Sequence, residues 1–163
     1  TADSHGRVFF VEVMGRHAGF IAMDVGIACG AEYIAVPEVV TDIDLLYHRI
    51  TEQGSNKRTI VVIGEGDDAG SATEIAATMN KRFGIEAKVT VLGHVQRGGS
   101  PTVRDRVLAS RLGVAAVEAL LDGRSDCMIG EVNNEIAFTS LRETWEKRKS
   151  IPPYMTVLAD LLV

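Results

Sequence analysis

The feature that most limits the fold of this chain is a regular alternation of short apolar runs with longer helical segments. Runs rich in β-branched, aromatic and other apolar residues predict strands at residues 8–13, 33–36, 59–63 and 89–92. The intervening segments predict helices at residues 18–29, 42–52 and 71–83, each with a glycine at or just beyond its end. This alternation is typical of α/β folds, and we expect a three-layer sandwich with a mainly parallel sheet.

One glycine-rich segment, LGHVQRGGSP at residues 92–101, joins the fourth predicted strand to a helix predicted at residues 103–121. Its glycines allow backbone N–H groups to approach a ligand. We expect Ser100 to cap the helix, with Pro101 in its first turn and Thr41 capping the earlier helix. The positive helix end, the Arg97 guanidinium and the His94 imidazole all suit an anion, so the segment predicts a phosphate site.

Two other predicted strands end in polar turns that would share a sheet edge with this segment. Met14, Gly15 and Arg16 follow the first strand, and Glu65 follows the third. Ligands of open parallel sheets bind beyond the carboxyl ends of the strands. Arg16 and Arg97 beside one carboxylate describe a phosphorylated sugar or polyol better than inorganic phosphate. Taken singly, each arginine could be a surface group and Glu65 a salt-bridge partner.

Length and charge restrict the organisation and the partners. At 163 residues, we expect one α/β domain over residues 1–163, with a ligand-binding core at 1–122. Residues 123–163 predict a strand at 127–130, an extended piece at 136–138 and helices at 141–149 and 154–162, which would pack on another part of a longer protein. The net charge of −5 argues against nucleic-acid and membrane partners.

The cysteines and histidines predict no metal site. Cys29 and Cys127 form no CxxC pair, and we expect both to be reduced in the core of a cytoplasmic protein. His5, His17 and His48 lack metal-ligand spacing. The ligand site is therefore expected to use arginine, histidine, carboxylate and backbone groups alone.

At these motifs the sequence resembles the C-terminal half of a bacterial-type 6-phosphofructokinase. The matching blocks are SHGR at residues 4–7, VEVMGR at 11–16 and VLGHVQRGGSPTVRDRVLASR at 91–111. The resemblance implies a cytoplasmic glycolytic enzyme, usually an allosteric homotetramer. Such an enzyme transfers the terminal phosphoryl group of ATP, with Mg²⁺, to the 1-hydroxyl of fructose 6-phosphate.

The resemblance also assigns roles to individual positions. The implied substrate-binding residues are Arg7, Met14, Gly15, Arg16, Glu65, Lys88, His94 and Arg97. Arg16 would also stabilise the charge on the transferred phosphoryl group, which makes it the implied catalytic residue. Glu65 would accept sugar hydroxyls, while His94 and Arg97 would hold the 6-phosphate.

Arg7 and Lys88 would act across a subunit boundary. Many relatives have arginine where this chain has Lys88, and lysine keeps the charge but loses the bidentate fork. Gly30, Glu32 and Lys57 correspond to a regulatory nucleotide site. The lysine-rich loop of that site is here Gly54-Ser55-Asn56-Lys57, which argues against the usual control by ADP and phosphoenolpyruvate.

The family's glycine-rich nucleotide loop and its general-base aspartate have no counterpart in this sequence. We therefore expect the chain to be a fragment that binds neither ATP nor Mg²⁺ and has no kinase activity by itself. Two alternatives stay open. The His17-Ala18-Gly19-Phe20 continuation resembles pyrophosphate-dependent relatives, and a non-catalytic regulatory subunit could retain the same sugar phosphate pocket.

Overall fold

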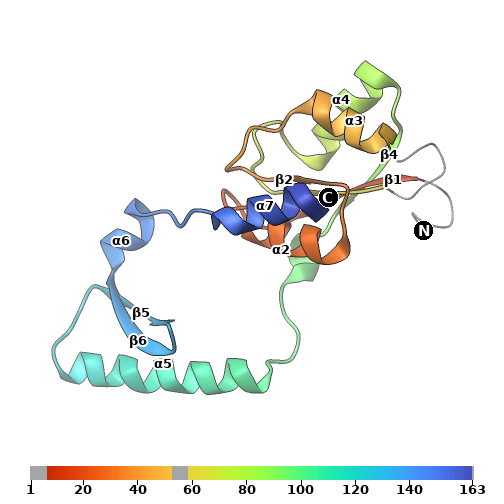
Figure 1. Cartoon of the computed structure of the whole chain (residues 1–163). Coiled ribbons are helices and arrows are strands. Elements are labelled where there is room, and N and C mark those ends of the chain that lie inside the picture. The colour runs from red at the N-terminus through yellow and green to blue at the C-terminus, as the bar shows by residue number, and fades with distance from the viewer. Residues whose placement is uncertain (1–6, 53–58, 163) are drawn as a thin grey trace. The chain divides into compact units, whose positions relative to one another are not determined.

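The computed structural model describes residues 7–52 and 59–162 (Figure 1). It divides into two compact units, Thr1–Arg97 with Ser150–Val163, and Gly98–Lys149. We call them the sheet unit and the hairpin unit. The expected boundary after residue 122 differs from this division, because the long helix before it lies in the same unit as the strands after it.

The described part of the sheet unit contains a four-stranded, fully parallel sheet. Its strands are β1 (Val8–Val13), β2 (Tyr33–Ala35), β3 (Thr59–Gly64) and β4 (Ala87–Val91), in the order β2-β3-β1-β4. The register pairs Val13 with Gly64 and Glu12 with Val91. The parallel sheet expected from the alternating pattern is confirmed, and its strands begin and end within two residues of the predicted bounds.

Helices cover both faces of this sheet. They are α2 (Phe20–Cys29), α3 (Ile43–Glu52), α4 (Ala72–Phe83) and α7 (Pro153–Leu162). One apolar cluster joins Phe10 to α3 and α4, and a second joins Val62 to α2 and α7. Figure 1 shows α3 and α4 on one side of the strands and α2 and α7 on the other. The three-layer sandwich is therefore confirmed.

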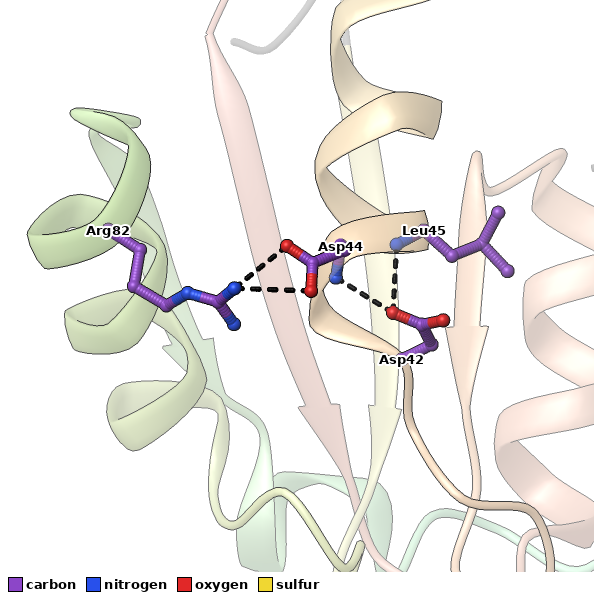
Figure 2. A network of polar contacts seen from close by, with 4 residues as sticks. All are labelled: Asp42, Asp44, Leu45 and Arg82. Atoms are coloured by element: carbon purple, nitrogen blue, oxygen red, sulfur yellow. Dashed lines mark hydrogen bonds and ion pairs between the residues drawn. The ribbon is translucent and has the colours of Figure 1, made fainter.

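Helix α3 begins differently from the prediction, as Figure 2 shows. Asp42, not Thr41, satisfies the helix start, because its carboxylate accepts hydrogen bonds from the N–H groups of Asp44 (2.9 Å) and Leu45 (3.0 Å). The Thr41 hydroxyl instead donates to the Asp67 carboxylate at 2.9 Å. Asp44 pairs with Arg82 of α4 at 2.8 Å, which ties the two helices together at the surface.

The hairpin unit contains α5 (Val103–Leu121), β5 (Cys127–Val132), β6 (Glu135–Ser140) and α6 (Leu141–Glu146). The predicted strand and extended piece pair as an antiparallel hairpin, outside the parallel sheet. Its two-residue turn is Asn133-Asn134, with φ of 53° and 66°. Asparagine tolerates this left-handed backbone, and that geometry matches the twist of the strands.

The start of α5 corrects a second capping prediction. Thr102 caps the helix through a capping box with Asp105, so Ser100 is not the cap and Pro101 precedes the helix. A short 3₁₀ helix, η1 (Gly93–Gln96), follows β4 after the single residue Leu92. The glycine segment therefore does not lead straight into the positive end of α5.

Side chains on the inner face of α5 hold the hairpin. Arg111 pairs with the Glu131 carboxylate and donates to the Asn134 carbonyl at 2.8 Å. Ala115 and Ala119 are the buried residues of the helix. The small alanine side chains permit close packing of the helix. Arg111 adds polar contacts to both strands' connecting region through Glu131 and Asn134.

Both cysteines lie outside the core. Cys29 is exposed at the end of α2, and Cys127 is half-buried in β5, so the expectation that both are core residues is wrong. Among the residues that the structure describes, no helix has the length and apolar character needed to cross a lipid bilayer.

Candidate functional site

The turns after β1, β3 and β4 lie together at the carboxyl ends of the parallel strands. The strands are parallel and in register, so Met14, Glu65 and Gly93 emerge side by side. They border a cavity of about 210 Å³. Its lining residues are Glu12, Val13, Met14, Glu65, Val91, Gly93 and His94. The structure thus brings together Met14, Glu65 and His94, three of the residues singled out from the sequence.

Glu65 holds the turn that follows β1. Its Oε2 atom accepts hydrogen bonds from the backbone N–H groups of Gly15 (3.3 Å) and Arg16 (3.0 Å). These bonds, the Arg16 bond first, lower the pKa of the Glu65 carboxyl below its ordinary value. The charges of Arg16 and Arg97 lower it further. Glu65 is therefore an ionised carboxylate with two arginines near it.

The turn after β3 packs closely on the turn after β1. Gly66 has φ of 85°, and a Cβ atom at this position would lie 2.1 Å from the carbonyl oxygen of Arg16. Only glycine, which has no Cβ atom, fits at this position. Arg16 itself has φ of 55°, an uncommon conformation for a residue with a side chain. The two turns therefore form one interlocked unit that fixes the backbone of Arg16.

Three basic residues belong to these turns. Arg16, His94 and Arg97 are all exposed, and of the three only His94 lines the cavity. Arg16 and Arg97 come from different turns, yet both act electrostatically on Glu65. Exposed guanidinium groups near one carboxylate can bind an anion while the carboxylate accepts hydroxyl hydrogen bonds.

Arg7 and Lys88 lie at the amino ends of the strands, opposite the turns that border the cavity. Arg7 immediately precedes β1, and Lys88 pairs with Phe9 near the amino end of the same strand. Six strand residues span about 17–20 Å, which separates these two cations from the turns of their own chain. The structure does not bring them to the cavity.

The structure describes two of the three residues implied in regulation, Gly30 and Glu32. The Glu32 carboxylate accepts the Ile60 N–H at 2.5 Å and so extends the β3 ladder. Gly30 ends α2 with φ of 62°. Lys57 lies outside the described residues. A regulatory site at these three positions stays a prediction, and Glu32 already has a structural partner.

Glu12 and Gln96 were missed by the sequence reasoning. Glu12 lines the cavity, and its carboxylate accepts the N–H of Ala72, the first residue of α4, at 2.8 Å. A single carboxylate within the apolar strand VFFVEV was a usable signal for it. Gln96 accepts the Met14 N–H at 2.8 Å through its side chain. Its place inside the GHVQRGG motif was the signal there.

Carboxylate, histidine and cysteine side chains are the usual protein ligands of metal ions. Within residues 7–52 and 59–162, no group of three or more such side chains could hold a metal ion. We assign no step of the chemistry on this chain to Mg²⁺.

Comparison with known proteins decides the family. A family profile described as "PFK: Phosphofructokinase" matches residues 1–120. The chain belongs to the phosphofructokinase family. The ATP-dependent 6-phosphofructokinase 1 of Thermus thermophilus is 52% identical over 99% of this chain and 51% of its own length. The chain thus spans about half the length of the curated relatives it matches.

Solved structures of the phosphofructokinase family share the fold. Phosphofructokinase from Saccharomyces cerevisiae matches with a TM-score of 0.73 and 33% identity, over 99% of this chain and 22% of the yeast chain. A pyrophosphate-dependent phosphofructokinase from Marinobacter aquaeolei matches with a TM-score of 0.73 and 25% identity, over 94% of this chain and 44% of its own. The family includes both kinds of phosphoryl donor.

Proposed function

We propose that this chain is the C-terminal, fructose 6-phosphate-binding half of an ATP-dependent 6-phosphofructokinase. The observation that carries the proposal is the convergence of the β1, β3 and β4 turns on one cavity, where two arginines act electrostatically on Glu65. The names of the curated relatives supply the donor and the reaction. The whole enzyme would transfer a phosphoryl group from ATP to the sugar 1-hydroxyl, as a step of glycolysis.

The basic side chains would bind the two phosphoryl groups of the reaction. Arg97 and His94 would bind the 6-phosphate, the arginine through its bidentate fork. Arg16 would face the transferred phosphoryl group and stabilise the charge that develops there. Its strained backbone is held by Glu65 and Gly66, so the guanidinium would be pre-positioned.

The Glu65 carboxylate has capacity left for the sugar. The hydrogen bonds from Gly15 and Arg16 both use Oε2, and no hydrogen bond to Oε1 is found among the described residues. A carboxylate accepts through both oxygens, so Oε1 can receive a sugar hydroxyl. Met14 and Gly15 would close the same side of the sugar.

The other half of the enzyme would bind ATP and Mg²⁺ and supply the general base. We propose that residues 123–149 pack on that half, whereas α7 packs on the sheet of this chain through Met155 and Ala159. The apolar residues Val114 (59% exposed) and Val117 (59% exposed) of α5 support extending the packing surface to this helix. A cytoplasmic location agrees with the two unpaired cysteines.

The functional enzyme would be a homotetramer. Arg7 and Lys88 lie at the far edge of their own sheet, which supports a role in the cavity of a neighbouring subunit instead. A residue that acts across a subunit boundary makes the complete site dependent on assembly. Binding by the isolated chain would accordingly be weaker than binding by the assembled enzyme.

Pyrophosphate is the second candidate donor. It is favoured by the similarity to the Marinobacter aquaeolei structure, whereas the 52% identical Thermus thermophilus relative is named for ATP. A donor assay on the full-length enzyme separates the two. Fructose 1,6-bisphosphate should form with ATP, and formation with pyrophosphate alone would assign the chain to the other class.

The sugar phosphate site is tested by calorimetry with fructose 6-phosphate. We expect Arg97→Ala to weaken binding at least about tenfold, since a charge-assisted bond to phosphate is lost. Arg148→Ala, an equal change of charge at an exposed site of the hairpin unit, is the matched control and should bind like the wild type. Equal affinities of Arg97→Ala and Arg148→Ala would remove the assigned role.

A further inference from the structure

Gln96 links two turns that lie far apart in the sequence. It is the last residue of η1 and directly precedes Arg97. Its side-chain Oε1 accepts the backbone N–H of Met14 at 2.8 Å, across 82 residues of chain. This bond joins the segment of His94 and Arg97 to the segment of Arg16.

The bond stands where the backbone ladder of the sheet stops. The last rungs on either side of β1 run from Leu92 N–H to the Glu12 carbonyl (3.1 Å) and from Glu65 N–H to the Val13 carbonyl (2.9 Å). The paired registers of the strands end at this point. Side-chain oxygens take over from backbone carbonyls at this point.

Three consecutive N–H groups of the β1 turn are held in this way. Gln96 holds Met14 from the β4 side, while Glu65 holds Gly15 and Arg16 from the β3 side. An unpaired N–H in a partly buried turn would carry a desolvation cost of roughly 1–3 kcal/mol. The path of the turn is therefore set by two side chains, one from each neighbouring strand.

We propose that Gln96 is a positioning residue of the enzyme, which sets the placement of Arg16 relative to His94 and Arg97. The carboxamide touches no reacting atom. It fixes the distance between the group at the transferred phosphoryl and the groups at the sugar phosphate. This inference rests on the proposed function, because it needs both ends of one substrate to be held at once.

Two substitutions of Gln96 separate the effect of the hydrogen bond from the effect of side-chain size. Gln96→Met keeps the length of the side chain but removes the acceptor. Gln96→Glu keeps an acceptor oxygen but adds a negative charge beside the phosphate-binding residues. Val95→Ser is the control within η1, since the Val95 side chain is 80% exposed.

The first readout is the Met14 amide of the ¹⁵N-labelled 163-residue chain. We expect its exchange with solvent to speed up about tenfold or more in Gln96→Met, as the bond is lost. Exchange should stay slow in Gln96→Glu and Val95→Ser. An unchanged Met14 amide in Gln96→Met would overturn the inference without any reference to activity.

The second readout is steady-state kinetics of the full-length enzyme. Misplacement of a catalytic group by about 1 Å can lower the rate by up to about a hundredfold, so Gln96→Met should lower kcat at least about tenfold and change KM less than about threefold. Gln96→Glu should do the reverse, raising KM for fructose 6-phosphate while keeping kcat. In an Arg16→Ala background, Gln96→Met should have less than about a twofold further effect.

The outcomes separate this inference from the proposed function. A wild-type enzyme without fructose 6-phosphate turnover removes the proposed function, and the inference with it. An active wild type whose kcat is unaffected by Gln96→Met overturns the inference alone. So does a Gln96→Met effect that multiplies fully with that of Arg16→Ala.

Discussion

The sheet unit and the hairpin unit use their apolar residues in opposite ways. In the sheet unit, Phe10, Val61 and Ile75 are each 0% exposed. Among the described residues of the hairpin unit, the buried apolar side chains are Ala115 and Ala119. The larger side chains of α5 stay open, as Leu121 is 83% exposed.

The difference teaches that helical periodicity identifies a helix but not what covers it. The helix predicted at residues 103–121 is present as α5, yet its valines and leucines do not form a core within the unit. The helices of the sheet unit bury their stripes against the sheet. We therefore expect the sheet unit to hold most of the stability of this chain.

The largest expected effect comes from removing a core side chain. Phe10→Ala should lower the free energy of unfolding of the sheet unit by about 3–5 kcal/mol, through lost burial and a cavity. Val114→Ala, on the exposed face of α5, should change the free energy of unfolding of the hairpin unit by less than about 0.5 kcal/mol. Urea denaturation followed by circular dichroism measures both, and equal losses would erase the contrast between the units.

Glycine substitutions extend the comparison to the turns. Gly66→Ala should destabilise the sheet unit by about 2–4 kcal/mol, because the positive φ and the contact with Arg16 both oppose a Cβ atom. Gly123→Ala is the matched change in the hairpin unit, where φ is 72° and no atom lies within 4 Å of the added Cβ. It should cost about 1 kcal/mol, the conformational part alone. A Gly66→Ala chain as stable as Gly123→Ala would show that the two turns are not interlocked.

The two units share an equivalent feature, a capping box, at Ser71 for α4 and at Thr102 for α5. Ser71→Ala and Thr102→Ala should each cost about 1 kcal/mol of local helix stability. Hydrogen exchange should show the Ser71→Ala loss throughout the sheet unit, since α4 belongs to its core. The Thr102→Ala loss should be confined to α5, and a loss that spreads to the strands of the sheet would contradict the comparison.

The smallest effect concerns Asp67, which is 6% exposed. Burial raises the pKa of this carboxyl, while bonds from the Ala69 N–H and the Thr41 hydroxyl oppose the rise. The folded state therefore keeps the proton to higher pH than the unfolded chain, and stability falls as pH rises from the ordinary aspartate value through the raised one.

Asp67→Asn should remove this pH dependence and match or exceed the wild type at pH 7 by up to about 1 kcal/mol. Unfolding free energies between pH 4 and 8 give the slope. A variant that is less stable at pH 7, with an unaltered slope, would show that the ionised carboxylate stabilises the fold.

Much of the sheet unit followed from local pattern. Apolar runs and glycines place its strands and helices to within two residues, because these strands are buried by their own helices. The hairpin was missed as a pair because strand pairing depends on the turn, and Asn133-Asn134 was not recognised as its signal. The caps of α3 and α5 were misplaced by one and two residues, since neighbouring polar residues compete for the same N–H groups.

The sequence was enough to predict which residues belong to the site, but not which hydrogen bonds they form. The order of parallel strands brings Met14, Glu65 and His94 to one edge, and motif position alone indicates that. That the Glu65 carboxylate holds backbone N–H groups depends on how two turns approach each other. The contact of Gln96 with Met14 depends on the same approach, and no local pattern encodes it.

The most direct measurement of the central claim is an NMR titration of the ¹⁵N-labelled chain with fructose 6-phosphate at millimolar concentration. The three-turn site predicts that the largest amide shifts fall on Met14, Gly15, Arg16, Glu65 and His94. Amides of α5 and of the β5–β6 hairpin should move far less. Largest shifts in the hairpin unit, or no shifts at the turns at any concentration, would contradict the account.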